Sequence, residues 1–385
     1  MALRITVVQG AFLPVPPLLG GGVEKLWFGL GKEFARRGHH VVHISRRFRD
    51  LPRTEIIGGV EHRRVRGFDA PLSKIYFRCL DALYALNVAR QLPPADILVT
   101  NTIFLPLLIR STRRGRLYVH VARYPKRQMR FYRHAHRLQT VSHSVGDAIR
   151  AEVPDCAAKI KVINPYLINE PPRIDFSMTW PRPEQRILYV GRIHPEKGLD
   201  LLIRAFCRLR ATADGGRTRL TIVGPHESQR GGGGDAYLAD LRRIAATAAD
   251  AIDWPGFVSA EELNRLYSQA SLFVYPSLAD DGESFGAAPL EAMSLGTPAI
   301  VSGLDCFRDF ITPGVNGFAF DHHSPSATED LAAMMNDALS NPARLQMIAA
   351  AAYETSRGFT LEKIATQYLD DFEMLCALGS VHELN

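Results

Sequence analysis

The chain has few cysteines and no long apolar run. Its five cysteines, at positions 79, 156, 207, 306 and 376, are scattered without CxxC spacing. An odd, scattered set predicts reduced thiols, and it provides no zinc site. The densest apolar run, residues 104–109, is far shorter than the roughly eighteen residues of a membrane span. The first residues also lack the basic start and apolar core of a signal peptide. We therefore expect a cytoplasmic protein without a transmembrane segment.

The composition of the 385 residues, with 46% hydrophobic and 22% charged, is that of a globular protein large enough for two domains. The net charge of +6 is divided unevenly. Residues 1–170 hold 28 Lys and Arg against 12 Asp and Glu, whereas the remainder holds 18 against 28. Basic clusters are often only solvated faces, but so large an excess also suggests an anionic partner for the N-terminal half. The clusters fall in residues 46–53, 63–66, 110–116 and 123–137.

Apolar runs alternate with helical patterns along the chain. Strands are predicted at residues 5–9, 41–45, 97–100, 117–121, 138–141 and 160–163, and helices at residues 23–37, 73–90 and 144–152. This alternation predicts a mostly parallel sheet covered by helices, with ligands at the carboxyl ends of the strands. A proline-rich stretch, residues 165–185, precedes a second alternating unit. We therefore expect one domain over residues 1–170, a second over 171–360, and a terminal helix over 361–385.

Residues 271–302 combine a short buried strand, a polar loop and the start of a helix at Pro289. Two carboxylates, Glu283 and Glu291, bracket the turn that leads into this helix. The unpaired amides of a helix start favour phosphate or hydroxyl groups. Carboxylates accept hydrogen bonds from the hydroxyls of a sugar or a ribose. A pair of glutamates at this spacing is common, so the small residues between them are the stronger indication of a ligand.

The segment Glu283-Ser-Phe-Gly-Ala-Ala-Pro-Leu-Glu291 resembles the E-x7-E region of the family 4 retaining glycosyltransferases (glycosyl transferases group 1). Gly191-Arg192 and Pro195-Glu-Lys197-Gly198 resemble a second motif of that family. The resemblance covers nearly the whole chain and is strongest over residues 186–320. It implies the GT-B fold: two Rossmann-like domains whose parallel sheets face a central cleft. The acceptor would bind to the first domain and the nucleotide sugar to the second, with the terminal helix crossing back to the first domain.

The resemblance also implies roles for individual residues. Arg192 and Lys197 would neutralise the leaving diphosphate, while Glu283 would hold sugar hydroxyls and Glu291 the ribose. His120, at the end of a strand, would contact the donor sugar. A lone strand histidine is more often a core residue, and the sequence His-Val-Ala-Arg departs here from the family's His-Asp or His-Gly.

Further nucleotide contacts are expected from Gly21, Gly22, Gly224, Phe257, Val258, Ser284, Phe285, Gly286 and Ala287. The glycines before residue 23 could equally serve only a tight turn. Phe257 fits a core position as well, so its backbone neighbours are the expected contacts with the base. The glycine run at residues 231–234 is interpreted as a flexible loop.

The implied activity is transfer of a sugar, with retention of configuration, from a nucleotide diphosphosugar, with a UDP-sugar slightly favoured over a GDP-sugar. No cofactor, catalytic metal or carboxylate nucleophile is expected. The acceptor would be a glycan or a lipid-linked intermediate of a surface polysaccharide. The basic segment 123–137 is interleaved with Met129, Phe131 and Tyr132. It could contact the anionic lipid head groups at the inner face of a membrane, or it could hold a lipid-diphosphate.

Two alternatives remain open. One is a nucleotide-sugar epimerase or hydrolase on the same two-domain fold. The other is a nucleic-acid-binding protein that uses the basic half. Nucleic acid is not the expected partner, because no stretch resembles an RNA- or DNA-binding motif.

Overall fold

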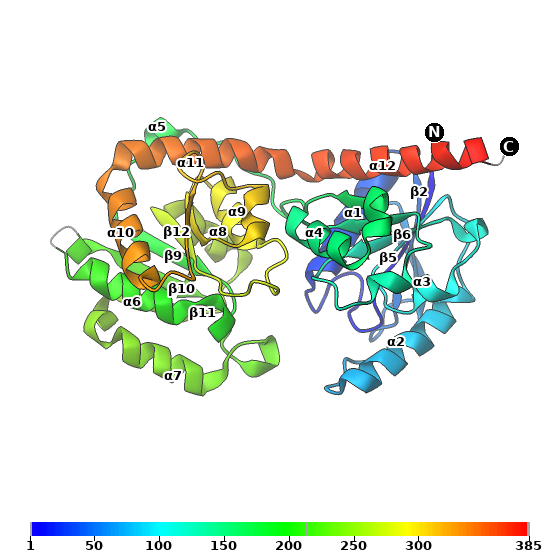
Figure 1. The fold of residues 1–385 in the computed structure, drawn as a ribbon, viewed down its shortest axis with the longest axis horizontal. Coiled ribbons are helices and arrows are strands. Elements are labelled where there is room, and N and C mark those ends of the chain that lie inside the picture. Colours follow the sequence, from blue (N-terminus) through cyan, green and yellow to red (C-terminus); the bar gives the residue numbers. More distant parts are fainter. Residues whose placement is uncertain (1, 213–214, 383–385) are drawn as a thin grey trace. The chain divides into compact units, whose positions relative to one another are not determined.

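A computed structural model describes residues 2–212 and 215–382 (Figure 1). The chain forms two compact units. Unit 1 comprises Met1–Ile168 and Leu361–Asn385, and unit 2 comprises Asn169–Thr360. Each unit is an α/β structure built on a sheet that is wholly or almost wholly parallel, which confirms the predicted fold class of two parallel-sheet domains. Among the described residues, no helix combines the length and the apolar character needed to span a bilayer.

Unit 1 contains an eight-stranded sheet with the strand order β3-β4-β2-β1-β5-β6-β7-β8. All neighbouring pairs are parallel except β3–β4. The strands are β1 (Arg4–Val8), β2 (His40–Arg46), β3 (Thr54–Ile57), β4 (Val60–Val65), β5 (Ile97–Thr100), β6 (Arg116–Val121), β7 (Arg137–Thr140) and β8 (Ile160–Val162). The α-helices are α1 (Gly22–Arg36), α2 (Lys74–Ala89), α3 (Leu105–Leu108), α4 (His143–Glu152) and α12 (Leu361–His382).

Helix α12 completes the core of unit 1. Its residues Tyr368 and Phe372 are fully buried and pack with Trp27 of α1 and Tyr118 of β6. Asp371 is buried as well, and its carboxylate accepts hydrogen bonds from the Tyr118 hydroxyl at 3.0 Å and from Arg137, with Nη2 at 2.5 Å. A buried carboxylate needs such partners to offset its desolvation. The predicted terminal helix is therefore part of the core of unit 1.

The antiparallel hairpin β3–β4 was not predicted. Its turn, Gly58-Gly59, has positive φ at both glycines, as hairpin turns favour, but β4 carries several basic residues. Arg64 is nevertheless buried: its guanidinium donates to the carbonyls of Val15 and Pro52 and pairs with Glu55. The interpretation of this basic cluster as a solvated face is therefore wrong for Arg64.

The basic segment 123–137 is also partly core. Met129 and Tyr132 are buried, and of the three interleaved apolar residues only Phe131 is exposed, with the Arg130 guanidinium 4.9 Å from its ring centroid. The predicted membrane surface therefore loses two of its three apolar members, because they pack into unit 1.

Unit 2 contains a six-stranded, wholly parallel sheet with the order β11-β10-β9-β12-β13-β14. Its strands are β9 (Arg186–Val190), β10 (Arg219–Val223), β11 (Ile252–Gly256), β12 (Leu272–Tyr275), β13 (Ala299–Ser302) and β14 (Phe318–Phe320). Its α-helices are α5 (Phe176–Thr179), α6 (Leu199–Arg210), α7 (Gly234–Ile244), α8 (Ala260–Gln269), α9 (Ala287–Ser294), α10 (Ala327–Ser340) and α11 (Pro342–Ser356). From β9 the chain continues outward to β10 and β11, and from β12 it continues outward in the opposite direction to β13 and β14. A topological switch point therefore lies between β9 and β12.

Short 3-10 helices connect these elements. They are η1 (Thr112–Arg114), η2 (Met129–Phe131), η3 (Pro154–Lys159), η4 (Pro195–Lys197), η5 (Gly215–Arg217), η6 (Ser228–Arg230), η7 (Ala245–Ala251), η8 (Asp305–Asp309) and η9 (Arg357–Phe359).

Candidate active site

The predicted donor-site residues of unit 2 follow the carboxyl ends of neighbouring parallel strands. Arg192 follows β9, Gly224 follows β10 and Phe257 follows β11, whereas Glu283 lies in the loop after β12. In open parallel sheets this edge is where ligands bind, and the switch point between β9 and β12 is the preferred position. The sequence spreads these residues over almost a hundred positions, and the sheet brings them to one edge.

The centre of this site is an ion pair between Lys197 and Glu283. The ammonium Nζ lies 2.6 Å from Oε2 of Glu283, and both side chains are buried. The same oxygen accepts hydrogen bonds from the Tyr275 hydroxyl and the Ser277 hydroxyl, each at 3.1 Å. No other hydrogen bond to this carboxylate occurs within residues 2–212 and 215–382. Its second oxygen, Oε1, is therefore the atom that remains for a ligand.

Tyr275 and Ser277 were not predicted as site residues. Tyr275 belongs to the continuous apolar run of β12, and such a run indicates only a buried strand. Burial raises the pKa of its hydroxyl well above the usual value, and the Glu283 carboxylate raises that pKa further. The hydroxyl therefore stays protonated and acts as a donor to Glu283.

Arg192 is more exposed than Lys197 and is held in place by two acceptors. Its Nη2 lies 2.6 Å from Oε1 of Glu196, and its Nη1 donates to the Gly231 carbonyl at 2.8 Å. Gly231 opens the run of four glycines, so this stretch is tied to the site. The interpretation as a flexible loop overlooked this contact, and it also overlooked the packing of Gly232, where a Cβ would lie 2.1 Å from the His226 carbonyl oxygen.

The loop from Ser284 to Gly286 leads directly into the first turn of α9. Gly286 has φ 73°, and a Cβ there would lie 2.4 Å from the Phe307 ring, so this position requires glycine. Helix α9 begins at Ala287, with Pro289 in its first turn as predicted. The Phe285 side chain is buried, with its ring 5.1 Å from that of Phe310. The prediction for Phe285 therefore has to be restricted to its backbone.

Four further predicted residues lie in unit 2, after β10, after β11 and in α9. Gly224 has φ 145° and a Cβ there would lie 1.8 Å from the Gly191 carbonyl oxygen, so the turn after β10 excludes any side chain. Phe257 is 73% exposed and the Arg230 guanidinium lies 5.2 Å from its ring centroid, which excludes the core alternative. Glu291 of α9 accepts a hydrogen bond from the Tyr267 hydroxyl at 3.2 Å. Val258, next to Phe257, is half-buried.

In unit 1, His120 lies near the carboxyl end of β6 but is buried. Its ring packs edge-on against Trp27 of α1, with centroids 5.4 Å apart, and Nδ1 lies 2.5 Å from Oε1 of Gln139. The Gln139 amide nitrogen donates to the carbonyls of Thr140 and Ile163, so its oxygen must accept from His120. The proton therefore sits on Nδ1, and Nε2 presents a lone pair.

That Nε2 atom is buried and has no hydrogen-bond partner in the described part of the chain. Burial lowers the pKa of His120 to about 4, although the hydrogen bond to Gln139 opposes the shift. His120 is thus a neutral, buried histidine with one unused acceptor, and its predicted contact with the donor sugar stays a prediction. A sugar hydroxyl could satisfy Nε2 only by reaching into this environment.

The glycine loop of unit 1 ends at the start of α1. Gly21 precedes the helix with φ 95°, and a Cβ there would lie 2.1 Å from Oε2 of Glu24. Gly22 opens the helix and has open space around it. Glu24 was not singled out from the sequence. Its buried carboxylate lies beside the loop whose glycines are predicted nucleotide contacts. Burial raises the pKa of this carboxyl group, and Arg123 opposes the shift.

Among the described residues, one group has the composition of a metal site. Asp280, His322 and His323 each offer one ligand atom within 4.8 Å of the others. Oδ1 of Asp280 lies 3.3 Å from Nε2 of His322 and 3.2 Å from Nε2 of His323. These contacts are those of ordinary histidine–carboxylate hydrogen bonds, and Asp280 and His323 are exposed. The expectation that no metal takes part in the reaction stays a prediction.

Both units match described protein families. Residues 20–166 match Glycosyltransferase Family 4, and residues 172–355 match Glycosyl transferases group 1. Sucrose-phosphate synthase from Thermosynechococcus elongatus has a similar fold, with a TM-score of 0.76 and 19% identity over 97% of this chain and 100% of that one. Anabaena Alr3699/HepE in complex with UDP-glucose gives a TM-score of 0.67 and 17% identity over 97% and 100% of the two chains. Fold and family matches together define a glycosyltransferase of the GT-B type.

The chain belongs to glycosyltransferase family 4. An uncharacterized glycosyltransferase of Methanocaldococcus jannaschii is 28% identical over 343 residues, which cover 78% of this chain and 82% of the relative. The D-inositol 3-phosphate glycosyltransferase of Rhodococcus opacus is 31% identical over 191 residues, which cover 50% of this chain but only 41% of that relative. This match thus spans less than half of the Rhodococcus protein.

Proposed function

We propose that this glycosyltransferase transfers a sugar from a nucleotide diphosphosugar, with retention of anomeric configuration and with a UDP-sugar favoured over a GDP-sugar. The observation that carries the proposal is the buried Lys197–Glu283 pair at the switch point of unit 2. A fixed cation beside an oriented carboxylate suits a substrate with a diphosphate next to sugar hydroxyls. The UDP-glucose complex of the similarly folded Alr3699/HepE supports the choice of a uridine nucleotide.

We assign each site residue the role that the family resemblance implies. Arg192 and Lys197 stabilise the charge that develops on the leaving diphosphate, together with the amides at the start of α9. Oε1 of Glu283 accepts hydrogen bonds from sugar hydroxyls, and Glu291 binds the ribose. The backbone next to Phe257 contacts the base.

The contacts of Glu283 also support a reaction without a carboxylate nucleophile. A nucleophilic carboxylate needs electron density at an oxygen that points at the sugar carbon. In Glu283 one oxygen accepts three hydrogen bonds, one of them from an ammonium group at 2.6 Å, and this withdraws charge from the group. We therefore expect no covalent glycosyl-enzyme. We also propose, from the family resemblance, that the transfer step needs no cofactor or metal.

For the acceptor we propose a glycan or a lipid-linked intermediate of a surface polysaccharide, reached at the cytoplasmic face of a membrane. An exposed apolar stripe along α2 supports a membrane contact. Tyr76, Leu83 and Leu86, spaced seven and three positions apart on one face of α2, are exposed, as are Ile75 of the helix and Leu72 just before it. Lys74 and Arg78 on the same helix are exposed as well. This combination of apolar and basic side chains suits the interface of an anionic bilayer.

A thermal-shift panel of UDP, GDP, ADP and the corresponding glucose conjugates tests the donor. Binding stabilises the native state by about 2.7 kcal/mol at a hundredfold excess over Kd. We expect one nucleoside diphosphate to raise Tm, and Arg192→Ala and Glu291→Ala to abolish the shift. Arg204→Ala and Glu261→Ala, at exposed positions of the same unit, are the matched controls and should keep it. A panel without any shift would contradict the proposal.

Radiolabelled donor then tests the reaction. Incubation without acceptor should release little free sugar, whereas rapid release of sugar or of an epimer would identify a hydrolase or an epimerase. Activity that persists in EDTA would agree with the proposed metal independence. Trapping of a sugar on Glu283 would contradict the proposed mechanism.

A further inference from the structure

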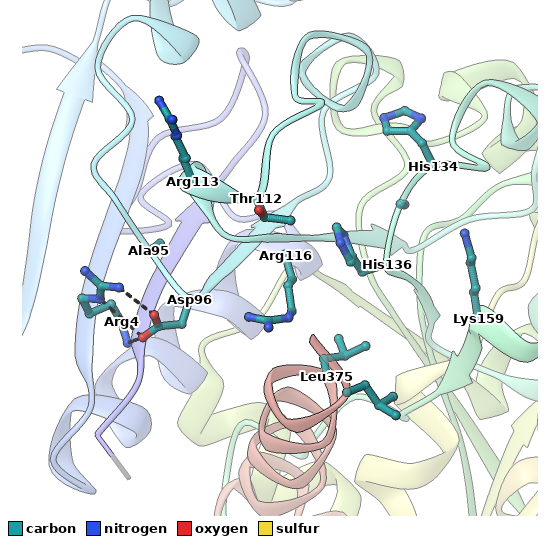
Figure 2. A pocket seen from close by; sticks show the side chains of 12 residues that line it. Arg4, Ala95, Asp96, Thr112, Arg113, Arg116, His134, His136, Lys159 and Leu375 are labelled. Carbon is teal, nitrogen blue, oxygen red and sulfur yellow. Dashed lines mark hydrogen bonds and ion pairs between the residues drawn. The ribbon is translucent and has the colours of Figure 1, made fainter. Parts of the chain in front are cut away.

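A pocket lies in unit 1, at the edge of the sheet opposite to the carboxyl end of β6, where His120 lies. Its cavity of about 760 Å³ is lined from the amino ends of five neighbouring strands, β1, β5, β6, β7 and β8, and from η1 and α12 (Figure 2). The first and last residues of β6 are five positions apart, which corresponds to about 17 Å in a strand. The pocket is therefore distinct from the ligand edge of the same sheet.

The lining of this pocket is strongly basic. It contains four permanently cationic side chains, those of Arg4, Arg113, Arg116 and Lys159, but only one carboxylate, Asp96. Arg4 neutralises that carboxylate, with Nη2 2.7 Å from Oδ1. Three cations therefore remain without a counter-charge from the lining. They come from one of the basic clusters of the sequence, residues 110–116, and from the end of η3 just before β8, and all three line the same pocket.

The remaining cations contact neutral groups. Nη2 of Arg116 donates to the Cys376 carbonyl at 3.1 Å, and Nζ of Lys159 donates to the Arg133 carbonyl at 2.7 Å. Both side chains keep further N–H donors. The Arg113 guanidinium has no hydrogen bond or ion pair with any residue that the structure describes. Figure 2 shows Arg116 and Lys159 on either side of His136.

His136 adds a neutral donor to the pocket. Its Nδ1 accepts the Leu117 N–H at 3.0 Å, so the neutral ring carries its proton on Nε2. Burial lowers the pKa of His136, and the charges of Arg116 and Lys159, together with His134, lower it further. The lowered pKa is consistent with a positive electrostatic potential at this ring, which a bound anion would offset.

One part of the lining is apolar. Leu375 and Leu378 of α12 line it, and Leu378 is 59% exposed. A free inorganic anion would leave this leucine wall in water. A phosphate group that carries an organic part would place its oxygens on the cations and its apolar part against α12.

We propose that this pocket binds a phosphate ester at a site separate from the donor site of unit 2. A phosphomonoester offers up to two charges and three acceptor oxygens, which matches the three uncompensated cations and the Nε2–H of His136. Arginine forks and lysine ammonium groups are the usual partners of such oxygens. The same chemistry occurs in soluble sugar phosphates and in phosphomonoester lipid headgroups, so the test distinguishes these two sources.

Isothermal titration with inorganic phosphate and with phenyl phosphate tests the site on the full chain. We expect phenyl phosphate to bind more tightly, because its ring contacts the leucine wall. Arg113→Gln with Lys159→Gln should weaken both ligands about tenfold or more, since each substitution removes a charge-assisted donor. Leu378→Ser should weaken phenyl phosphate alone. Arg110→Gln, which removes an exposed charge from the same segment outside the pocket, should change neither.

The contradicting outcomes are equally specific. Unchanged affinity in the Arg113→Gln, Lys159→Gln variant, with an unchanged urea unfolding midpoint, would overturn the proposal. So would the absence of any phosphate binding to the unaltered protein. Loss of binding in Arg192→Ala instead would assign the phosphate to the donor site. The proposal does not depend on the identity of the donor, because UDP binding should be unaltered in the pocket variants.

A vesicle sedimentation experiment distinguishes a soluble phosphate ester from a lipid headgroup. Vesicles of phosphatidylcholine with and without phosphatidic acid are sedimented with the unaltered protein and with the double variant. If the double variant loses affinity for soluble phenyl phosphate but keeps its binding to phosphatidic acid vesicles, the ligand is a soluble ester. If it loses binding to the vesicles as well, a phosphomonoester lipid headgroup also occupies this pocket.

Discussion

Lys197 and Glu283, 86 positions apart in the sequence, form a buried ion pair of 2.6 Å between the loops that follow β9 and β12. Each residue was predicted to act separately, one on the diphosphate and the other on the sugar. Their contact means that the two charges orient each other before a substrate arrives. A ligand diphosphate then meets a cation whose position is already fixed, which is how preorganised sites reduce the cost of reorganisation.

The ion pair predicts an asymmetric effect of mutations on stability. Lys197→Ala leaves a buried carboxylate without its cation, so the free energy of unfolding should fall by about 3–5 kcal/mol. The double variant Lys197→Met, Glu283→Gln removes both charges, while the glutamine oxygen still accepts from Tyr275 and Ser277. Its stability should lie within about 1 kcal/mol of the unaltered protein. Urea unfolding measures both values.

The double variant Lys197→Met, Glu283→Gln should separate the effect on activity from the effect on stability. The stable double variant should still lose transferase activity, because neither the cation nor the anionic oxygen remains. If the double variant were as active as the unaltered protein, the pair would be purely structural. If it were as unstable as Lys197→Ala, the destabilisation of the single variant would have a cause other than an unpaired buried charge.

Sequence patterns predicted the parallel strands well, because strands buried on both faces are continuous apolar runs with few alternatives. Strand β4 was missed because Arg63 and Arg64 interrupt that pattern, and the buried environment of Arg64 depends on carbonyls supplied by distant loops.

For the candidate site, the motifs placed Arg192, Lys197 and Glu283 on loops that follow predicted strands. Because the strands are parallel, these loops lie at the same carboxyl edge of the sheet. The partners of these residues could not be predicted in the same way. Tyr275 is part of an apolar strand, and Gly231 is part of a glycine run, so neither carries a local signal of its contact with the site. Such contacts depend on the tertiary arrangement alone.

Two adjacent glycines provide a matched test of the loop before α1. Gly21→Ala would require a Cβ 2.1 Å from the Glu24 carboxylate at φ 95°, so we expect a loss of about 1–3 kcal/mol in the free energy of unfolding. Gly22→Ala meets no atom within 4 Å and has no positive φ, so its stability should be unchanged or slightly raised. Equal effects of the two substitutions on thermal unfolding would contradict this account of the loop.

The exposed stripe of α2 predicts salt-sensitive membrane binding. The double variant Ile75→Ser, Leu83→Ser should lose cosedimentation with anionic vesicles, because it removes apolar area from the helix face. Ile56→Ser, a substitution of an equally exposed isoleucine on β3, is the control and should bind as the unaltered protein does. Binding should weaken as salt screens Lys74 and Arg78. Retention of vesicle binding by the double variant would exclude α2 as the contact.

We expect His120 to lower the free energy of unfolding at acidic pH. Its pKa is about 4 in the folded chain because burial disfavours the charged ring, whereas an unfolded histidine titrates near 6.5. Between these values the unfolded state binds more protons, so stability falls as the pH decreases from about 6.5 towards 4. At pH 5 this single group should cost about 2 kcal/mol relative to pH 7.5.

His120→Gln removes that titration, so the loss of stability between pH 7.5 and 5 should be about 2 kcal/mol smaller in the variant. Comparing the pH dependence within each protein cancels any packing change that the substitution itself introduces. Other buried histidines, such as His62, titrate in the same direction and remain in both proteins. Urea unfolding at the two pH values provides the measurement. If the variant lost as much stability on acidification as the unaltered protein, His120 would have to bind its proton in the folded state, with Nε2 open to solvent.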